Sequence, residues 1–211
     1  MLRAIDESDG YLVRRLGTGD EEAFRTLYRR CQGPVYRFAL HMSGRPEIAE
    51  DITQEVFLTL IRDGDRFDPS RGALQGYLLG IGRNLLLRRF EKERVFVAFP
   101  GSREADESRT ERKTEHADLV VPPPDLVQNE TIRRVRDAVL RLPANYREVV
   151  VLCDLEELSY EEAASVLQVA VGTVRSRLHR GRNLLMEKLR EFRKPEDRAA
   201  ASKTNVARSR P

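Results

Sequence analysis

The sequence predicts an all-α protein made of two small helical modules joined by a flexible linker. Three observations favour this fold class. Apolar residues recur with helical spacing in every strongly patterned segment. Ser159 and Glu162 form a capping box, which predicts a helix from Tyr160 and, after a tight turn, a longer helix from Thr173. A stretch of mixed charge that ends in three prolines separates the two groups of helices.

Composition supports small modules with much exposed surface. The chain has 211 residues, of which 40% are hydrophobic and 34% are charged, so there is room for one or two small domains. Cys31 and Cys153 lie far apart without metal-ligand spacing, and both are expected to be small buried side chains in a reducing compartment. No apolar run approaches the ~20 residues of a membrane-spanning helix, so membrane insertion is not expected.

The first module is predicted over residues 19–98. It follows an N-terminal extension, residues 1–18, which has little periodicity and is expected to fray. The first helix of the module spans residues 20–43. Gly33 and Pro34 fall inside this helix and predict a kink or a brief break, because proline removes a backbone donor and crowds the preceding turn.

The second predicted helix, residues 47–62, has two distinct faces. Its buried stripe comprises Ala49, Ile52, Val56 and Leu60. Its opposite face is acidic with one leucine. This face comprises Glu47, Asp51, Gln54 and Leu58, with Glu55 at its edge. An acidic exposed face is usually only a solvated surface, but a leucine in its middle favours a surface for a protein partner.

A turn-rich loop, residues 63–72, leads into the third predicted helix, residues 73–94. The loop carries Phe67 and Arg71, and the C-terminal half of the helix is basic. The predicted buried side of the helix comprises Leu74, Tyr77, Leu78, Ile81 and Leu85. An aromatic loop before a basic helix suits single-stranded nucleic acid, because bases stack on aromatic rings and guanidinium groups.

The linker is predicted over residues 99–128 and the second module over residues 129–194. Two shorter helices, one ending before Pro143, precede the helix pair and complete a four-helix unit. The remaining residues, 195–211, are polar and basic, and are expected to be a disordered tail.

The last helix has a core stripe on one side and a polar face on the other. At about 100° per residue the stripe comprises Val174, Leu178, Leu185, Leu189 and Phe192. The opposite face comprises Arg175, Ser176, His179, Arg180 and Asn183, with Arg177 and Arg182 on the flanks. Helices that read the major groove have this layout, in which the face contacts base edges and the flanks contact phosphates. The alternative is a solvated basic helix that packs on an acidic one.

Patterns typical of enzymes or of metal and cofactor sites are missing from the sequence. His41, His116 and His179 do not cluster with cysteines or carboxylates. The sequence has no glycine-rich phosphate loop, no G-x-S-x-G motif and no nucleophile–base pair. We therefore expect no catalytic activity, no metal and no cofactor.

Several segments resemble a known family. LPANYREVVVL, ELSYEEAASVL and VGTVRSRLHRGRNLL resemble the fourth conserved region of bacterial extracytoplasmic-function (ECF) sigma factors. AEDITQEVFLTLIR resembles their second region, and RFDPSRGALQGYLLGIGRNLLLRRFEKER resembles the segment that captures and melts the minus-ten promoter element. The resemblance covers roughly residues 20–192, and both modules in this order are a specific signature.

The resemblance implies three sets of site residues. The set for docking core RNA polymerase is Asp51, Gln54, Glu55 and Leu58. The set for the minus-ten element is Phe67, Arg71, Arg83, Asn84 and Arg88. The set for the minus-thirty-five element is Thr173, Arg175, Ser176, Arg177, His179 and Arg180. The implied protein is a cytoplasmic transcription initiation factor that binds core RNA polymerase and promoter DNA, with an anti-sigma factor as a further suggested partner.

Two other functions stay open at this point. A helix-turn-helix regulator that binds duplex DNA alone would explain the second module but leaves the first three helices without a role. A protein-interaction adaptor would make the basic helix incidental. Run-off transcription with purified core polymerase separates all three.

Overall fold

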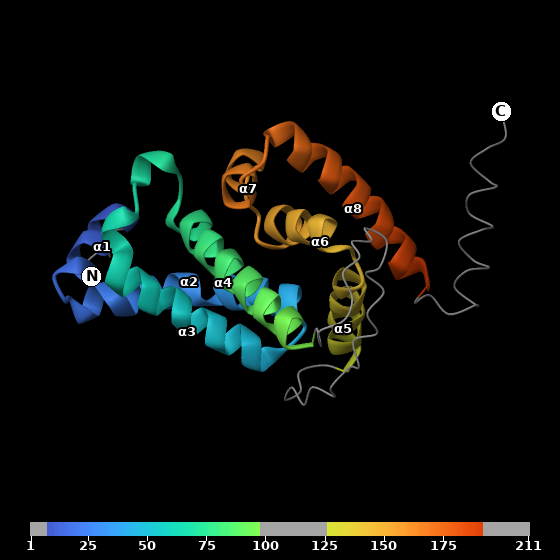
Figure 1. Ribbon diagram of the computed structural model, residues 1–211, viewed down its shortest axis with the longest axis horizontal. Helices are drawn as coiled ribbons and strands as arrows, with labels where there is room; N and C mark the ends of the chain where they lie inside the picture. Colours follow the sequence, from blue (N-terminus) through green and yellow to red (C-terminus); the bar gives the residue numbers. More distant parts are fainter. Residues whose placement is uncertain (1–7, 98–125, 192–211) are drawn as a thin grey trace.

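The computed structural model describes residues 8–97 and 126–191, and these residues form helices and turns without a β-strand (Figure 1). The first module contains α1 (Asp9–Gly17), α2 (Glu21–Ser43), α3 (Pro46–Asp63) and α4 (Leu74–Val97). The second contains α5 (Leu126–Leu140), α6 (Ala144–Val150), a π-helical turn at Val151–Leu155, α7 (Tyr160–Leu167) and α8 (Val171–Glu191). The predicted all-α class is confirmed. The predicted tail and most of the predicted linker lie outside the described residues.

Helix α1 corrects the expectation that the N-terminal extension frays. Leu12, Val13 and Leu16 of α1 are buried in the core of the first module. The Arg15 side chain donates a 2.8 Å hydrogen bond to Asp20, which caps the start of α2. The helix has only nine residues, so its apolar pattern is too short to stand out in the sequence. The first module therefore has four helices in place of the predicted three.

Helix α2 continues through Gly33 and Pro34, so the predicted brief break is wrong. Proline removes one backbone donor, but Val35 and Phe38, just after it, are almost completely buried. Burial of these side chains against the neighbouring helices outweighs the lost hydrogen bond. The helix ends where Gly44 adopts a left-handed conformation with φ of 72°.

The buried side of α4 differs from the predicted one. Its core residues are Leu74, Leu78, Leu79 and Leu86. Tyr77, Ile81 and Leu85 are only half-buried. Gly82 is buried between the leucines, and a side chain there would lie 3.5 Å from the Val56 side chain of α3. Because glycine has no apolar side chain, Gly82 does not contribute to the hydrophobic pattern although it lies at the centre of the contact. The pattern therefore predicted a buried side of α4 that is rotated from the observed one.

The second module begins its helix pair as predicted. The Glu162 side chain accepts a 2.9 Å hydrogen bond from the Ser159 backbone N–H, and Ser159 Oγ accepts one of 3.2 Å from the Glu162 N–H. Helix α8 starts at Val171, two residues before the predicted start at Thr173. Gly181 lies where α8 crosses α6 closely, because a Cβ there would be 2.9 Å from Val150 Cγ2.

The two modules contact each other (Figure 1). Helix α2 packs on α5, α6 and the π-helical turn, while α4 packs on α7. A Cβ at Gly44, at the end of α2, would lie 3.1 Å from the Leu140 side chain of α5. None of the helices in the two described stretches combines the length and hydropathy that a membrane crossing needs.

His41 makes the fold sensitive to acid. It lies on α2, and its pKa is lowered to about 4 by burial and by the positive charges of Arg136 on α5 and Arg37 on α2. The unfolded chain, with an ordinary histidine pKa of 6.5, binds a proton at a higher pH than the folded chain. The contribution of neutral His41 to the free energy of unfolding is therefore fully present above pH 6.5, and it is lost as the pH falls towards 4. We expect a loss of about 2 kcal/mol between about pH 7.5 and pH 5.

The measurement is urea denaturation at these two pH values. His41→Gln removes this titration, so the variant should lose about 2 kcal/mol less than the parent over the same interval. Identical pH dependence in the two proteins would show that His41 is not held neutral by burial.

Candidate nucleic-acid and polymerase interfaces

Helix α8 presents a polar face to solvent. Arg175, Ser176, His179 and Arg180 are exposed. Behind them, Val174 is 0% and Leu178 is 2% exposed. Thr173 and Arg177 are half-buried at the edges of this face. The structure thus brings the predicted minus-thirty-five residues onto one side of one helix. Of the rest of the predicted core stripe, Leu185 and Leu189 are half-buried and Phe192 lies outside the described residues.

Contacts within the second module orient part of this face. The Arg175 guanidinium lies 5.8 Å from the centre of the Tyr160 ring of α7, within the range of a cation–π interaction. Arg182 makes hydrogen bonds of 3.0 and 2.6 Å to Asp154, and these bonds raise the pKa of the guanidinium. The sequence predicts Arg182 on a flank of α8 that contacts phosphates. In the structure the Nε and Nη2 donors of its guanidinium are instead paired with the Asp154 carboxylate.

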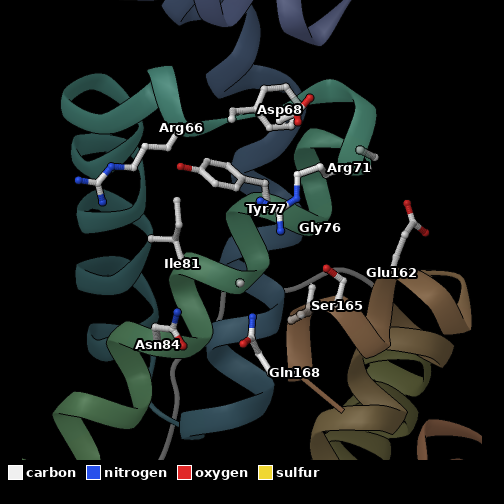
Figure 2. A pocket seen from close by; sticks show the side chains of 15 residues that line it. Arg66, Asp68, Arg71, Gly76, Tyr77, Ile81, Asn84, Glu162, Ser165 and Gln168 are labelled. Carbon is white, nitrogen blue, oxygen red and sulfur yellow. The ribbon is translucent and has the colours of Figure 1, made fainter. Parts of the chain in front are cut away.

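A groove of about 450 Å³ lies between the two modules, beside the loop that precedes α4 (Figure 2). Phe67, Arg71 and Asn84, three of the five predicted minus-ten residues, line its first wall. The Phe67 ring packs on the Tyr77 ring with centroids 5.4 Å apart. The second wall comes from α7 and the turn after it, and comprises Glu162, Ser165, Val166 and Gln168.

The other two predicted minus-ten residues lie outside this groove. Arg83 turns to Glu148 of the second module, with hydrogen bonds of 2.9 and 3.4 Å, and its side chain is only 18% exposed. Arg88 is exposed farther along α4. The basic face that the sequence predicts on α4 is therefore divided between solvent and a protein carboxylate.

The outer face of α3 carries the predicted docking residues. Asp51, Gln54 and Glu55 are exposed, and Leu58 is 58% exposed. Ile61, which the sequence analysis missed, is 46% exposed and extends the apolar surface, as its position one turn after Leu58 could have indicated. Asp51 forms a 2.9 Å ion pair with Arg89 of α4, so a substitution at Asp51 would also change the surface of α4.

Comparisons with known proteins identify both modules. Residues 27–95 match the family described as Sigma-70 region 2, and residues 132–185 match Sigma-70, region 4. The ECF RNA polymerase sigma factor SigW of Bacillus subtilis is 32% identical over 180 residues, which cover 85% of this chain and 96% of that protein. This chain belongs to the ECF sigma factors. It is therefore a promoter-recognising RNA polymerase sigma factor.

Other relatives and solved structures agree with this assignment. The ECF RNA polymerase sigma factor SigE of Mycolicibacterium smegmatis is 36% identical over 180 residues, which cover 82% of this sigma factor and 65% of that protein. The sigma factor RpoE of Bartonella quintana, solved with the anti-sigma factor NepR, has a TM-score of 0.59 at 25% identity and covers 81% of this chain and 98% of its own. CnrH, solved with the cytosolic domain of CnrY, has a TM-score of 0.64 at 23% identity over 89% of this chain and 100% of its own, and this likeness concerns the fold alone.

Within the described residues of this sigma factor, no group of three or more histidine, cysteine or acidic side chains could hold a metal ion.

Proposed function

We propose that this sigma factor docks on core RNA polymerase through the outer face of α3, the face formed by Asp51, Gln54, Glu55 and Leu58. It reads the minus-thirty-five element with the exposed side of α8. It engages the minus-ten element with Phe67, Arg71, Arg83, Asn84 and Arg88. The observation that carries this proposal is the exposed polar side of α8 behind which Val174 and Leu178 are buried.

The proposed activity involves no chemistry by the chain itself, since the polymerase forms the bonds and the sigma factor only places it and traps opened DNA. Its place of action is the cytoplasm, where core RNA polymerase and the chromosome are. Residues 19–98 and 129–194 act as the two DNA-binding modules, and α1 adds to the first. An anti-sigma factor is a further proposed partner, because RpoE of Bartonella quintana has been solved with one.

The proposal is tested by run-off transcription with purified core polymerase and a set of promoters. Transcripts that depend on the added protein support it. A protein that binds duplex DNA but never binds polymerase would instead be a stand-alone regulator. A protein that binds neither would be an interaction adaptor.

Base reading and phosphate contact should respond differently to substitution. Arg175 and Arg180 are exposed at the centre of the proposed reading face, and Arg177 is half-buried at its edge. Arg175→Ala or Arg180→Ala should cost about 1–3 kcal/mol at the minus-thirty-five element and relax sequence preference there. Arg177→Ala should weaken binding evenly across sequences and reduce its salt dependence.

The measurement is fluorescence anisotropy with matched and scrambled duplexes at several salt concentrations. Equal effects of all three substitutions on specificity would mean that α8 does not lie in the groove as proposed.

A further inference from the structure

The contact between the two modules buries two carboxylates of the second module. The Glu156 side chain, just after the π-helical turn, is 0% exposed, and it accepts hydrogen bonds of 3.2 and 2.7 Å from Arg37 of α2. Glu148 of α6 is 10% exposed and accepts bonds of 2.9 and 3.4 Å from Arg83 of α4. In both pairs the cation comes from the first module and the carboxylate from the second.

Two backbone contacts accompany these pairs. The Gln75 side-chain amide of α4 donates a 3.0 Å hydrogen bond to the Glu156 carbonyl. The Arg147 guanidinium donates bonds of 2.9 Å to the Met42 carbonyl of α2 and 3.0 Å to the Leu142 carbonyl of its own module. The contact therefore combines directional polar bonds with apolar packing, since buried side chains of both modules belong to one hydrophobic cluster.

The energetic character of such pairs makes the contact reversible. A buried charge is tolerated only while its partner is present, and removing one partner is strongly destabilising. The Arg37 side chain is 52% exposed, so in that pair mainly the carboxylate is removed from water, and a pair of this kind contributes little beyond the desolvation cost. Separation of the modules would return both carboxylates to water together, so the closed arrangement is expected to be favoured only moderately over an open one.

We propose that the two pairs, Arg37–Glu156 and Arg83–Glu148, form a latch in the sense that this sigma factor closes only while each buried carboxylate has its partner, and that the closed state withholds its minus-ten surface. The inference rests on the proposed function of that surface. In the closed state Nε and Nη2 of Arg83 are engaged by Glu148, so they are not available to a DNA phosphate. Figure 2 shows Glu162, Ser165 and Gln168 of the second module on the side of the groove opposite Arg71. DNA bound to the first wall of that groove would be obstructed by these side chains of the second wall.

The latch is tested by measuring the distance between the modules in the whole protein. Glu47 on α3 and Glu187 on α8 are both exposed, so Glu47→Cys and Glu187→Cys provide positions for spin labels. Burial raises the pKa values of Cys31 and Cys153 to about 11. A thiol-specific spin label reacts with the thiolate, so at neutral pH it labels the two introduced cysteines in preference to these native ones. The readout is the distribution of distances by electron–electron double resonance.

The decisive variant is Arg37→Gln, which leaves the buried Glu156 carboxylate unpaired. The parent should show a single short distance. In Arg37→Gln the ratio of open to closed molecules should rise at least about tenfold, visible as a longer and broader distribution. A parent that is already extended, or a variant that stays as compact as the parent, would overturn the latch.

Two controls separate the latch from a general loss of charge. Arg37→Gln combined with Glu156→Gln leaves no charge to bury and should return to the short distance. If that double variant stays open, the Arg37–Glu156 pair is not the cause. Asp154→Asn removes a carboxylate two residues from Glu156 that pairs within its own module, with Arg182, and should leave the distance unchanged. Opening by Asp154→Asn would overturn the assignment to the two pairs.

A second experiment, the binding of single-stranded DNA, tests whether closure inhibits contact with the minus-ten element. Arg37→Gln should bind a single strand that carries the minus-ten element about tenfold more tightly than the parent, because less of the protein is in the closed state. If distances behave as expected but neither protein binds the strand, the minus-ten assignment and the inhibitory role both fail. If the strand binds both proteins equally while distances depend on Arg37, the inhibitory role alone is overturned. If the strand is bound but distances do not depend on Arg37, the latch fails and the proposed function stands.

Discussion

Replacing Gly181 by leucine is expected to disrupt the second module and to abolish binding to the minus-thirty-five element. A Cβ at this position would lie 2.9 Å from Val150 Cγ2 and 3.3 Å from the Tyr146 carbonyl oxygen of α6. The first group can move slightly, but the carbonyl belongs to the backbone of a packed helix. A leucine would force α6 and α8 apart, at a cost of about 3 kcal/mol or more. Thermal denaturation and binding to duplex DNA measure the two consequences.

Gly172→Ala, in the first turn of the same helix, is the matched control. Nothing lies within 4 Å of a Cβ there, so the change should raise stability by up to about 1 kcal/mol through helix propensity and leave DNA binding intact. If Gly181→Leu were as stable as the parent, the close crossing of α6 and α8 would be wrong.

Leu58→Asp is expected to abolish the binding of core RNA polymerase while leaving the fold intact. Leu58 is 58% exposed on α3 and Ile61 beside it is 46% exposed, so the substitution removes few internal contacts. A side chain that is a hot spot of a protein interface contributes about 2 kcal/mol or more, roughly thirtyfold in affinity. A buried aspartate at the contact would add a desolvation cost. Pull-down of core polymerase, alongside circular dichroism of the variant, gives the result.

Tyr11→Asp on α1 provides the comparison, because Tyr11 is 45% exposed outside the proposed docking face. It should retain polymerase binding within about twofold. Normal polymerase binding by a folded Leu58→Asp variant would remove the docking assignment from α3. Asp51 is less suitable for this test, since its ion pair with Arg89 would be lost at the same time.

Features that depend on local pattern could be predicted from the sequence. The two faces of α8 follow from residues three and four apart, so Val174 and Leu178 could be placed in the core and Arg175 and Arg180 in solvent. The capping box between Ser159 and Glu162 is also local. Both predictions are confirmed because no distant contact is needed to specify them.

Features that depend on distant partners could not be predicted. The sequence pattern of a basic residue on a helix face is the same whether its side chain binds a DNA phosphate or pairs with a carboxylate of the protein. Arg83 meets Glu148, which is 65 residues away in sequence, and Arg182 meets Asp154. Helix α1 was missed for a related reason, because its nine residues gain their order from packing on other helices.

Cys31 is buried as predicted and Cys153 is only half-buried, and this shielding of the two thiols has a consequence for redox signalling. With pKa values of about 11, Cys31 and Cys153 carry on the order of one thiolate in ten thousand at neutral pH. Peroxides and disulfide reagents attack the thiolate, so both cysteines should resist oxidation far longer than an ordinary exposed cysteine. This chain is consequently a poor sensor of oxidants through its own cysteines.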